Sequence, residues 1–160
     1  MTSILGISAF YHDSAAALIL DGEIIAAAQE ERFSRKKHDP SYPYNAVKYV
    51  LKQANLELSN VDHIVFFEKP FLKFERILET YMAFAPRGFK SFSLSMPIWL
   101  REKLFQKKFL YEKLKSHDEN FNDINKIKFS EHHYSHAASA FYPSPFKEAI
   151  VLTLDGVGEW

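Results

Sequence analysis

The chain lacks cysteine, lacks a net charge and lacks any apolar run long enough to cross a bilayer. The absence of cysteine excludes disulfides, a thiolate nucleophile and thiolate metal ligands, and it fits a reducing compartment. Basic and acidic residues number 20 each, so no overall field draws the chain to nucleic acid or to an anionic membrane. No basic, signal-like segment precedes the first apolar residues. We therefore expect a cytoplasmic protein with neither nucleic acid nor a membrane as its partner.

Apolar residues, by contrast, are abundant. They make up 47% of 160 residues, which is enough to bury a sizeable core within one globular α/β domain. Phenylalanine is the most frequent aromatic residue, and many copies lie between Phe66 and Phe109. Apolar residues in that stretch recur at helical spacing, which favours packing in a core or against a partner over stacking on nucleic acid.

Three β-like runs open the sequence, at residues 4–9, 14–20 and 23–29. The second and third are separated by Asp21-Gly22, and Asp-Gly between apolar runs favours a tight hairpin. The order predicts an antiparallel meander. Residues 30–39 are densely charged and are followed by Pro40, so we expect a loop or exposed surface there.

The remainder alternates helical and β-like segments. Apolar residues recur at helical spacing after Pro43, while β-branched and aromatic residues mark the strands. Residues 86–88, Pro-Arg-Gly, separate two helices, and Ser95 is placed to cap the second. This order describes a mixed sheet covered by helices. The predicted helices are residues 43–55, 71–84, 97–114 and 137–141, and the predicted strands are 61–67, 126–130 and 149–154, the last buried on both faces.

The strongest candidate site is the run His132-His133-Tyr134-Ser135-His136. If the run is helical, His132 and His136 lie one turn apart on one face, where two neutral imidazoles can bind one cation. Asp155, at the end of a predicted strand, is the obvious third ligand. Two histidines and a carboxylate suit ferrous iron, zinc or manganese. The alternative is that the histidines merely decorate a helix; His133 points elsewhere and has no assigned role.

Two further motifs could contact phosphate. Gly156 and Gly158 follow a predicted strand, where backbone N–H groups can approach an anion, although an ordinary turn explains two glycines equally well. In the connection between the first two runs, His12 is flanked by a carboxylate and can serve as a general base. Asp13 and Ser14 beside it are candidate phosphate-binding residues, and they are also common turn residues.

Four segments in order resemble the signatures of NodU/CmcH-type carbamoyltransferases. They are GISAFYHDSAA (6–16), QEERFSRKKH (29–38), EHHYSHAASAFYP (131–143) and LDGVGEW (154–160). The resemblance implies an actin-like, ribonuclease H-like (ASKHA) α/β fold with a mixed sheet, related to the tRNA threonylcarbamoyl-transfer proteins. It implies that residues 1–160 are the N-terminal part of that domain, that residues 67–125 are a helical insertion, and that a C-terminal YrdC-like domain is absent.

The resemblance also implies a reaction. In that family carbamoyl phosphate and ATP give a carbamoyl-adenylate, whose carbamoyl group passes to a hydroxyl of a sugar, antibiotic or lipo-oligosaccharide. Carried over to this sequence, His132, His136 and Asp155 would bind a divalent metal, with Fe²⁺ favoured over Zn²⁺ or Mn²⁺, and His12 would face the acceptor hydroxyl. A C-terminal subunit or domain is an expected partner.

Two rival interpretations stay open. A phosphotransferase of the acetate and sugar kinase group would share the fold, but it would need only magnesium held by carboxylates and phosphates. An inactive remnant that at most binds a partner is the second. Asp155-Gly156 resembles a hairpin turn whose return strand would begin where the sequence stops, so we expect a truncated chain.

Overall fold

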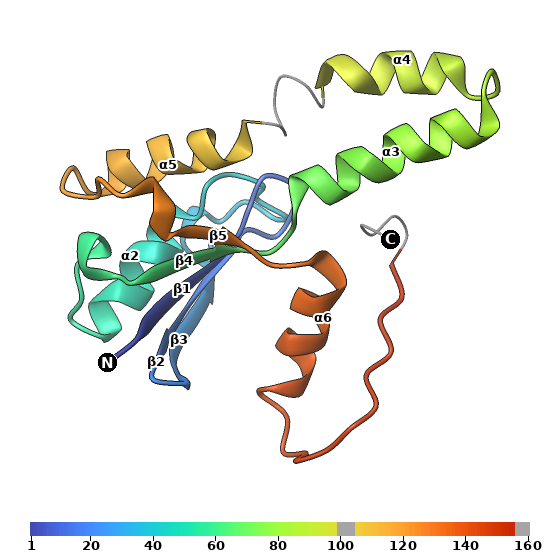
Figure 1. The fold of residues 1–160 in the computed structure, drawn as a ribbon. Helices are drawn as coiled ribbons and strands as arrows, with labels where there is room; N and C mark the ends of the chain where they lie inside the picture. Colours follow the sequence, from blue (N-terminus) through green and yellow to red (C-terminus); the bar gives the residue numbers. More distant parts are fainter. Residues whose placement is uncertain (99–104, 156–160) are drawn as a thin grey trace. The chain divides into compact units, whose positions relative to one another are not determined.

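The computed structural model shown in Figure 1 describes residues 1–98 and 105–155. The chain divides into two compact units. Unit 1 comprises Met1–Phe67 and Lys107–Lys128, and unit 2 comprises the described parts of Glu68–Gln106 and Phe129–Trp160. The strands are β1 (Ser3–Ser8), β2 (Ala15–Leu20), β3 (Glu23–Gln29), β4 (His63–Phe66) and β5 (Ile127–Phe129). The helices are α1 (Glu31–Ser34), α2 (Tyr44–Gln53), α3 (Pro70–Phe84), α4 (Phe89–Ile98), α5 (Gln106–His117) and α6 (His132–Phe141), with 3₁₀ turns at Leu58–Asn60 and Ile124–Lys126.

The five strands form one mixed sheet in the order β3-β2-β1-β4-β5. β1 pairs with β2 and β2 with β3 in antiparallel fashion, which confirms the predicted meander. β4 lies parallel to β1 on its other side. The chain reaches β4 from β3 through α2, a crossover long enough to permit parallel pairing. The expected α/β class, a mixed sheet with flanking helices, is confirmed.

The hairpin between β2 and β3 turns at Asp21 and Gly22, as the sequence predicts. Both residues have positive φ, 48° and 91°, which is the signature of a type I′ turn. The Asp21 carboxylate also accepts a hydrogen bond of 2.6 Å from the backbone N–H of Thr2. The turn therefore fixes the register of β2 and β3 and ties the hairpin to the start of the chain.

One face of the sheet carries the core of unit 1. Leu5 of β1 lies between Leu18 of β2 and Ile64 of β4, and all three are fully buried. Helix α2 packs on β2 and β3 through Ala46, Val47, Val50 and Leu51, the spacing of a single apolar stripe. Among the residues that the structure describes, every buried Ala, Val, Leu, Ile and Phe belongs to unit 1.

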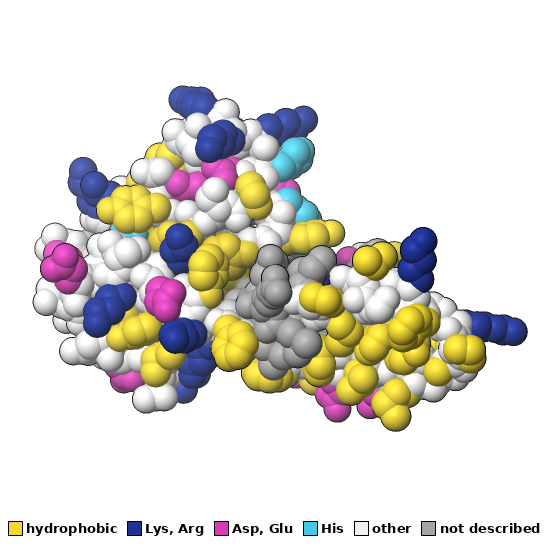
Figure 2. Space-filling view, turned by 90° about the horizontal axis from the view of Figure 1, so that it is seen from above, with side chains coloured by type: hydrophobic (Ala, Val, Ile, Leu, Met, Phe, Trp, Pro, Cys, Tyr) yellow, Lys and Arg dark blue, Asp and Glu magenta, His cyan; other side chains and the backbone are white. Residues whose placement is uncertain are grey.

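Unit 2 is built differently. Its helices α3 and α4 are joined by a turn at Gly88 (φ 79°), and Tyr81 of α3 stacks on Phe92 of α4 at 4.0 Å between ring centroids. Hydrophobic side chains gather on the surface of these two helices (Figure 2), and the large exposed ones are Phe71, Leu78, Met82, Phe84, Phe89 and Leu94. Nowhere in residues 1–98 and 105–155 does a helix reach the length and apolarity that a membrane span requires.

Two predictions in the helical regions are corrected by the structure. The charged stretch expected to be a loop or exposed surface contains the one-turn helix α1, which has no buried residue and whose Ser34 N–H donates to the carbonyl of Glu30 at 2.9 Å. A helix does not begin at Pro97 under a Ser95 cap. Instead α4 begins directly after Gly88, Pro97 lies in its last turn, and the Ser95 hydroxyl donates back to the Phe92 carbonyl. Helix α5 is a separate element.

The predicted strand at residues 149–154 is wrong. The segment forms no strand, and Ile150, Leu152 and Leu154 are 101%, 79% and 87% exposed. An apolar run becomes a strand only where a neighbouring strand satisfies its N–H and C=O groups, and the described part of the chain supplies none here. The helical character of residues 67–125 is visible in α3, α4 and α5, while their status as an insertion stays a prediction.

Candidate functional site

Helix α6 places two histidines on one face. It begins at His132 because Glu131 is extended and its carbonyl accepts the Ser135 N–H at 2.8 Å, and it ends before Pro143, which cannot continue the ladder. His136 follows His132 by four residues, so the two rings lie one above the other. The helix is therefore longer at its start than predicted, and it gives His132 and His136 the helical spacing on which the metal prediction depended.

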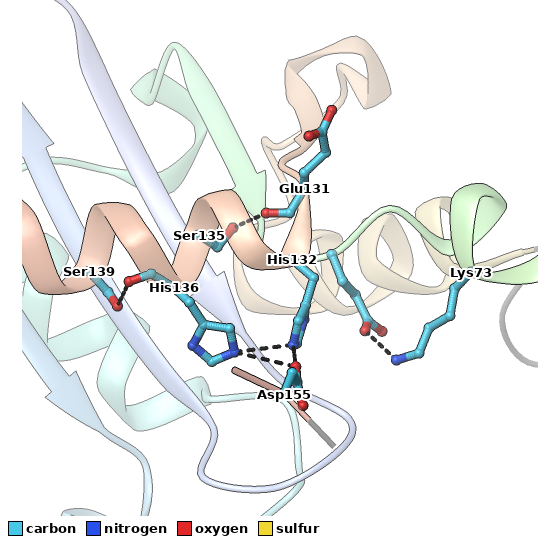
Figure 3. A network of polar contacts seen from close by, with 8 residues as sticks. Lys73, Glu131, His132, Ser135, His136, Ser139 and Asp155 are labelled. Atoms are coloured by element: carbon cyan, nitrogen blue, oxygen red, sulfur yellow. Dashed lines mark hydrogen bonds and ion pairs between the residues drawn. The ribbon is translucent and has the colours of Figure 1, made fainter. Parts of the chain in front are cut away.

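Asp155 completes a group of three ligand atoms, shown in Figure 3. The His132 Nε2 lies 2.5 Å from Asp155 Oδ2 and 3.1 Å from the His136 Nε2. The His136 Nε2 lies 3.8 Å from the same carboxylate oxygen. All three atoms fall within 4.8 Å of one another. We call these residues the His132 group; all of them belong to unit 2.

The donor set and the spacing of the His132 group fit a divalent cation. Ligands at 2.0–2.1 Å from a tetrahedral metal stand about 3.3 Å apart, and the two longer separations, 3.1 and 3.8 Å, bracket that value. The shortest, between His132 and Asp155, is shorter than a normal hydrogen bond and would have to widen by less than 1 Å to admit a metal. Two imidazoles and one carboxylate leave coordination positions open for a substrate.

Burial within the His132 group is graded. The side chains of His132, Asp155 and His136 are 14%, 27% and 56% exposed, so the group opens to solvent on the side of His136. Glu131, the residue before α6, forms an ion pair with Lys69, and Glu131 Oε1 lies 2.8 Å from Lys69 Nζ. This pair links the start of α3 to the start of α6. Nearby Lys73 pairs with the buried carboxylate of Glu68 at 3.1 Å.

A second histidine–aspartate group lies in unit 1 and consists of His12, Asp13 and His38. The His12 Nδ1 is 2.7 Å from Asp13 Oδ2, and the His38 Nδ1 is 2.9 Å from Asp13 Oδ1. The hydrogen bonds from His38 and then from His12 lower the pKa of the Asp13 carboxyl, because both stabilise its ionised form. We call these residues the His12 group. Both imidazoles are well exposed, at 59% and 61%.

The structure thus brings together the three predicted metal ligands, and it places His12 beside Asp13. The hydroxyl of Ser14 is buried and contacts no polar partner within the described residues. An ionised Asp13 offers a phosphate no donor, so its predicted phosphate contact gains no support from this geometry. Gly156 and Gly158, also predicted to bind phosphate, lie outside the described residues.

Sequence reasoning missed two residues of unit 1. His38 was grouped with a solvated charge run, and nothing in its spacing pointed to Asp13, 25 positions earlier. Glu30 belonged to the same run, yet it is only 3% exposed and accepts hydrogen bonds from Asn45 Nδ2 at 2.6 Å and from the Ala46 N–H at 2.8 Å. The helix start that Glu30 contacts is that of α2, about 15 positions later, and nothing in its local sequence pointed to it.

Known proteins similar to this chain were then compared with it. The family described as "Carbamoyltransferase N-terminus" matches residues 3–160. The Uncharacterized protein sll1178 of Synechocystis sp. is 60% identical over 161 residues, which cover 100% of this chain and 26% of that protein. The Nodulation protein NolNO of Sinorhizobium fredii is 35% identical over 154 residues, covering 94% of this chain and 20% of that protein.

Among solved structures, YeaZ from Pseudomonas aeruginosa is similar at 22% identity and a TM-score of 0.33, over 44% of this chain and 31% of that one. The chain spans about a quarter or less of the length of the two curated relatives. The family match, in contrast, extends over almost every residue. On that match, the chain belongs to the family of carbamoyltransferase N-terminal domains.

Proposed function

We propose that this chain is the N-terminal part of an O-carbamoyltransferase that moves a carbamoyl group from carbamoyl phosphate, through a carbamoyl-adenylate made with ATP, to a hydroxyl of a sugar, antibiotic or lipo-oligosaccharide. Membership of the family supports the reaction class. The observation that carries the proposal is the convergence of His132, His136 and Asp155, because a helical pair of imidazoles aimed at one carboxylate is a donor set for a transition metal.

The His132 group would hold the cation, with ferrous iron favoured by the family and zinc or manganese as alternatives. When bound, such an ion acts as a Lewis acid that polarises a carbonyl or phosphoryl oxygen. His132 and His136 would each offer Nε2, and the Asp155 carboxylate would offset part of the charge of the cation. His132 is the least exposed of the three side chains, and the exposed His136 leaves room for a substrate.

His12 would act as the general base. Its Nδ1 is engaged with Asp13, so its Nε2 is the nitrogen left to accept a proton. In the transfer step the acceptor oxygen bonds to the carbamoyl carbon, the bond from that carbon to the adenylate oxygen breaks, and AMP leaves. The proton of the acceptor hydroxyl passes to His12 Nε2. Asp13, Ser14, Gly156 and Gly158 remain the predicted phosphate contacts.

The partners of the proposed enzyme are a small molecule with a free hydroxyl and a C-terminal domain or subunit of the YrdC-like kind, in the cytoplasm. The family match favours this reaction over the phosphotransferase alternative. The His132 group favours it as well, because a kinase site would need carboxylates and phosphates around magnesium rather than imidazoles. The remnant alternative predicts no metal affinity, and metal binding therefore separates it from the proposal.

The test is metal content and affinity of the purified chain, measured for the wild type, His132→Ala and Asp155→Ala. We expect one equivalent of iron, zinc or manganese in the wild type and none in either variant. His133→Ala is the matched control, because it removes a neighbouring imidazole of the same helix that contacts the His132 ring but is not one of the three candidate ligands. A folded wild-type chain that binds no metal, or one that loses metal equally in His133→Ala, would overturn the proposal.

A further inference from the structure

The His12 group contains a residue to which the proposed function gives no role. His38 Nδ1 donates to the same carboxylate that engages His12, and each imidazole contacts a different oxygen of Asp13. The contact joins two loops that are 25 residues apart in sequence. A carboxylate placed between two imidazoles determines which nitrogen of each ring carries hydrogen.

The consequence concerns tautomers. An ionised carboxylate only accepts hydrogen bonds, so each nitrogen that faces it must carry the proton. In the neutral imidazole the other nitrogen then has a lone pair. Asp13 therefore fixes His12 with hydrogen on Nδ1 and a proton-accepting Nε2, and it does the same to His38. A carboxyl is ionised at neutral pH in any case, and these hydrogen bonds lower the pKa of Asp13 further.

The two loops that carry the group are held together on both sides of it. The Phe10 N–H donates to the Pro40 carbonyl at 2.9 Å, and the Ser14 N–H donates to the Asp39 carbonyl at 2.9 Å. The His38 N–H in addition donates to Glu31 Oε2 at 3.2 Å. These contacts set the distance between the loops.

The backbone conformation of the two loops also indicates that they are held in a fixed arrangement. Phe10, Asp13, Arg35 and His38 all have φ between 51° and 71° although none is glycine. Left-handed backbone at non-glycine residues is uncommon and persists only where the surroundings enforce it. Four such residues lie in the two loops around a single carboxylate, which indicates that the surrounding structure enforces the backbone conformation of both loops.

We propose that Asp13 and His38 are positioning residues for His12, a role that rests on the function proposed for His12. Asp13 holds His12 in the tautomer whose Nε2 accepts a proton. His38 holds the other carboxylate oxygen through its own hydrogen bond and so keeps the carboxylate turned toward His12. The charged groups around the site are consistent with this, because the Glu31 carboxylate is engaged by the His38 backbone, and the neighbour on the far side of His12 is the Tyr11 ring at 4.6 Å.

The experiment reads the tautomers directly. In the full chain labelled with ¹⁵N-histidine, two-bond ¹H–¹⁵N correlations show which nitrogen of each ring carries hydrogen. We expect hydrogen on Nδ1 of both His12 and His38 in the wild type at pH 7.5. In Asp13→Asn one carboxylate oxygen becomes an NH₂ donor, so one of the two rings must move its hydrogen to Nε2.

Asparagine is the substitution of choice because it tolerates the left-handed backbone at this position. His38 is tested by a matched pair for the same reason. His38→Asn keeps a donor near the position of Nδ1, whereas His38→Gly removes it and keeps the backbone free to adopt its angle. We expect the two-bond correlations of His12 to show a mixture of tautomers in His38→Gly and to return to the Nδ1–H pattern in His38→Asn. His63, exposed on β4, is the internal reference and should be the same in all variants.

Hydrogen on Nε2 of His12 in the folded wild type would overturn the inference. An unchanged His12 tautomer in both Asp13→Asn and His38→Gly would overturn it as well. None of these readings depends on metal or on carbamoyl transfer. A chain that shows the expected tautomers but binds no metal would refute the proposed function alone, and a chain that binds metal with the wrong tautomer would refute this inference alone.

Discussion

Both units of the chain contain two histidines grouped with one aspartate, and the two groups are arranged in opposite ways. In the His12 group the carboxylate lies between the rings and engages both Nδ1 atoms, so both Nε2 atoms are directed away from it. In the His132 group both Nε2 atoms converge on one carboxylate oxygen. Two histidines and one aspartate therefore give outward-facing bases in unit 1 and a candidate cation-binding cluster in unit 2.

The backbone creates this difference. A helix with histidines at positions i and i+4 presents both rings to the same side, where one carboxylate can meet them. Two loops that approach a central aspartate place the rings on opposite sides of it. Residue type supplies the donors, and local secondary structure decides which nitrogen is available for chemistry.

The units differ in their cores as well. Unit 1 buries its apolar residues between the sheet and α2, whereas the described part of unit 2 leaves large hydrophobic side chains exposed on α3, α4 and residues 150–154. Asp155 follows that exposed segment directly. Substitutions should therefore have unequal costs in the two units.

The largest effect is expected from truncating the core of unit 1. Leu5→Ala removes a fully buried side chain of the central strand and should lower the free energy of unfolding by about 2–5 kcal/mol. Leu152→Ala is the same substitution at a residue that is 79% exposed, and it should change stability by less than about 0.5 kcal/mol. Urea denaturation measures both. Comparable losses would show that residues 149–154 are packed in solution.

This contrast marks how far the fold could be predicted. The alternation in β1 and the Asp21-Gly22 turn are local signals, and both were read correctly. The run at 149–154 has the composition of a buried strand, but a strand also needs a neighbour, and composition carries no information about whether one is present. Helix α4 was misplaced because Ser95 and Pro97 suggested a start, while Gly88 provided the actual one.

The next effect separates the two groups by metal. Asp155→Asn should weaken zinc or cobalt binding at least 100-fold, because it removes one of three ligand atoms and the only charged one. Asp13→Asn should leave the affinity unchanged within twofold, since its imidazoles present their Nδ1 atoms to a carboxylate rather than to a cation. Cobalt absorption titrations on both variants provide the comparison. Equal losses would mean that the assignment of roles to the two groups is wrong.

The candidate metal ligands could be predicted because a helical i, i+4 pair of histidines is visible in the sequence. Asp155 follows the helix closely enough in the chain for its carboxylate to return to that pair. The His12 group could be predicted only in part. His12 and Asp13 are adjacent, whereas His38 reaches them through loop contacts whose left-handed residues are not glycines and leave no mark in the sequence.

A third effect tests how unit 1 accommodates a buried carboxylate. Glu30 accepts from Asn45 and from the Ala46 N–H at the start of α2, so Glu30→Ala should cost about 1–3 kcal/mol by leaving these donors unpaired. Glu23→Ala, at an exposed position of β3, is the control and should cost less than about 0.5 kcal/mol. Thermal or urea unfolding gives the comparison. A neutral Glu30→Ala would mean that water satisfies the start of α2 as well as the carboxylate does.

The smallest effect is expected from acid. The Asp62 carboxylate accepts hydrogen bonds from the Ser3 N–H at 2.8 Å and from its hydroxyl at 2.9 Å, and these bonds lower the pKa of Asp62. Since the folded pKa lies below the unfolded one, the contribution to stability is complete above about pH 5 and is lost as the pH falls through the folded pKa. Asp62→Asn cannot titrate, so its free energy of unfolding should fall less steeply than that of the wild type between about pH 5 and pH 3. Ser3→Ala, which removes one donor, should lie between the two. Parallel slopes for all three proteins would show that the link between β1 and β4 through Asp62 does not contribute to the acid sensitivity of unit 1.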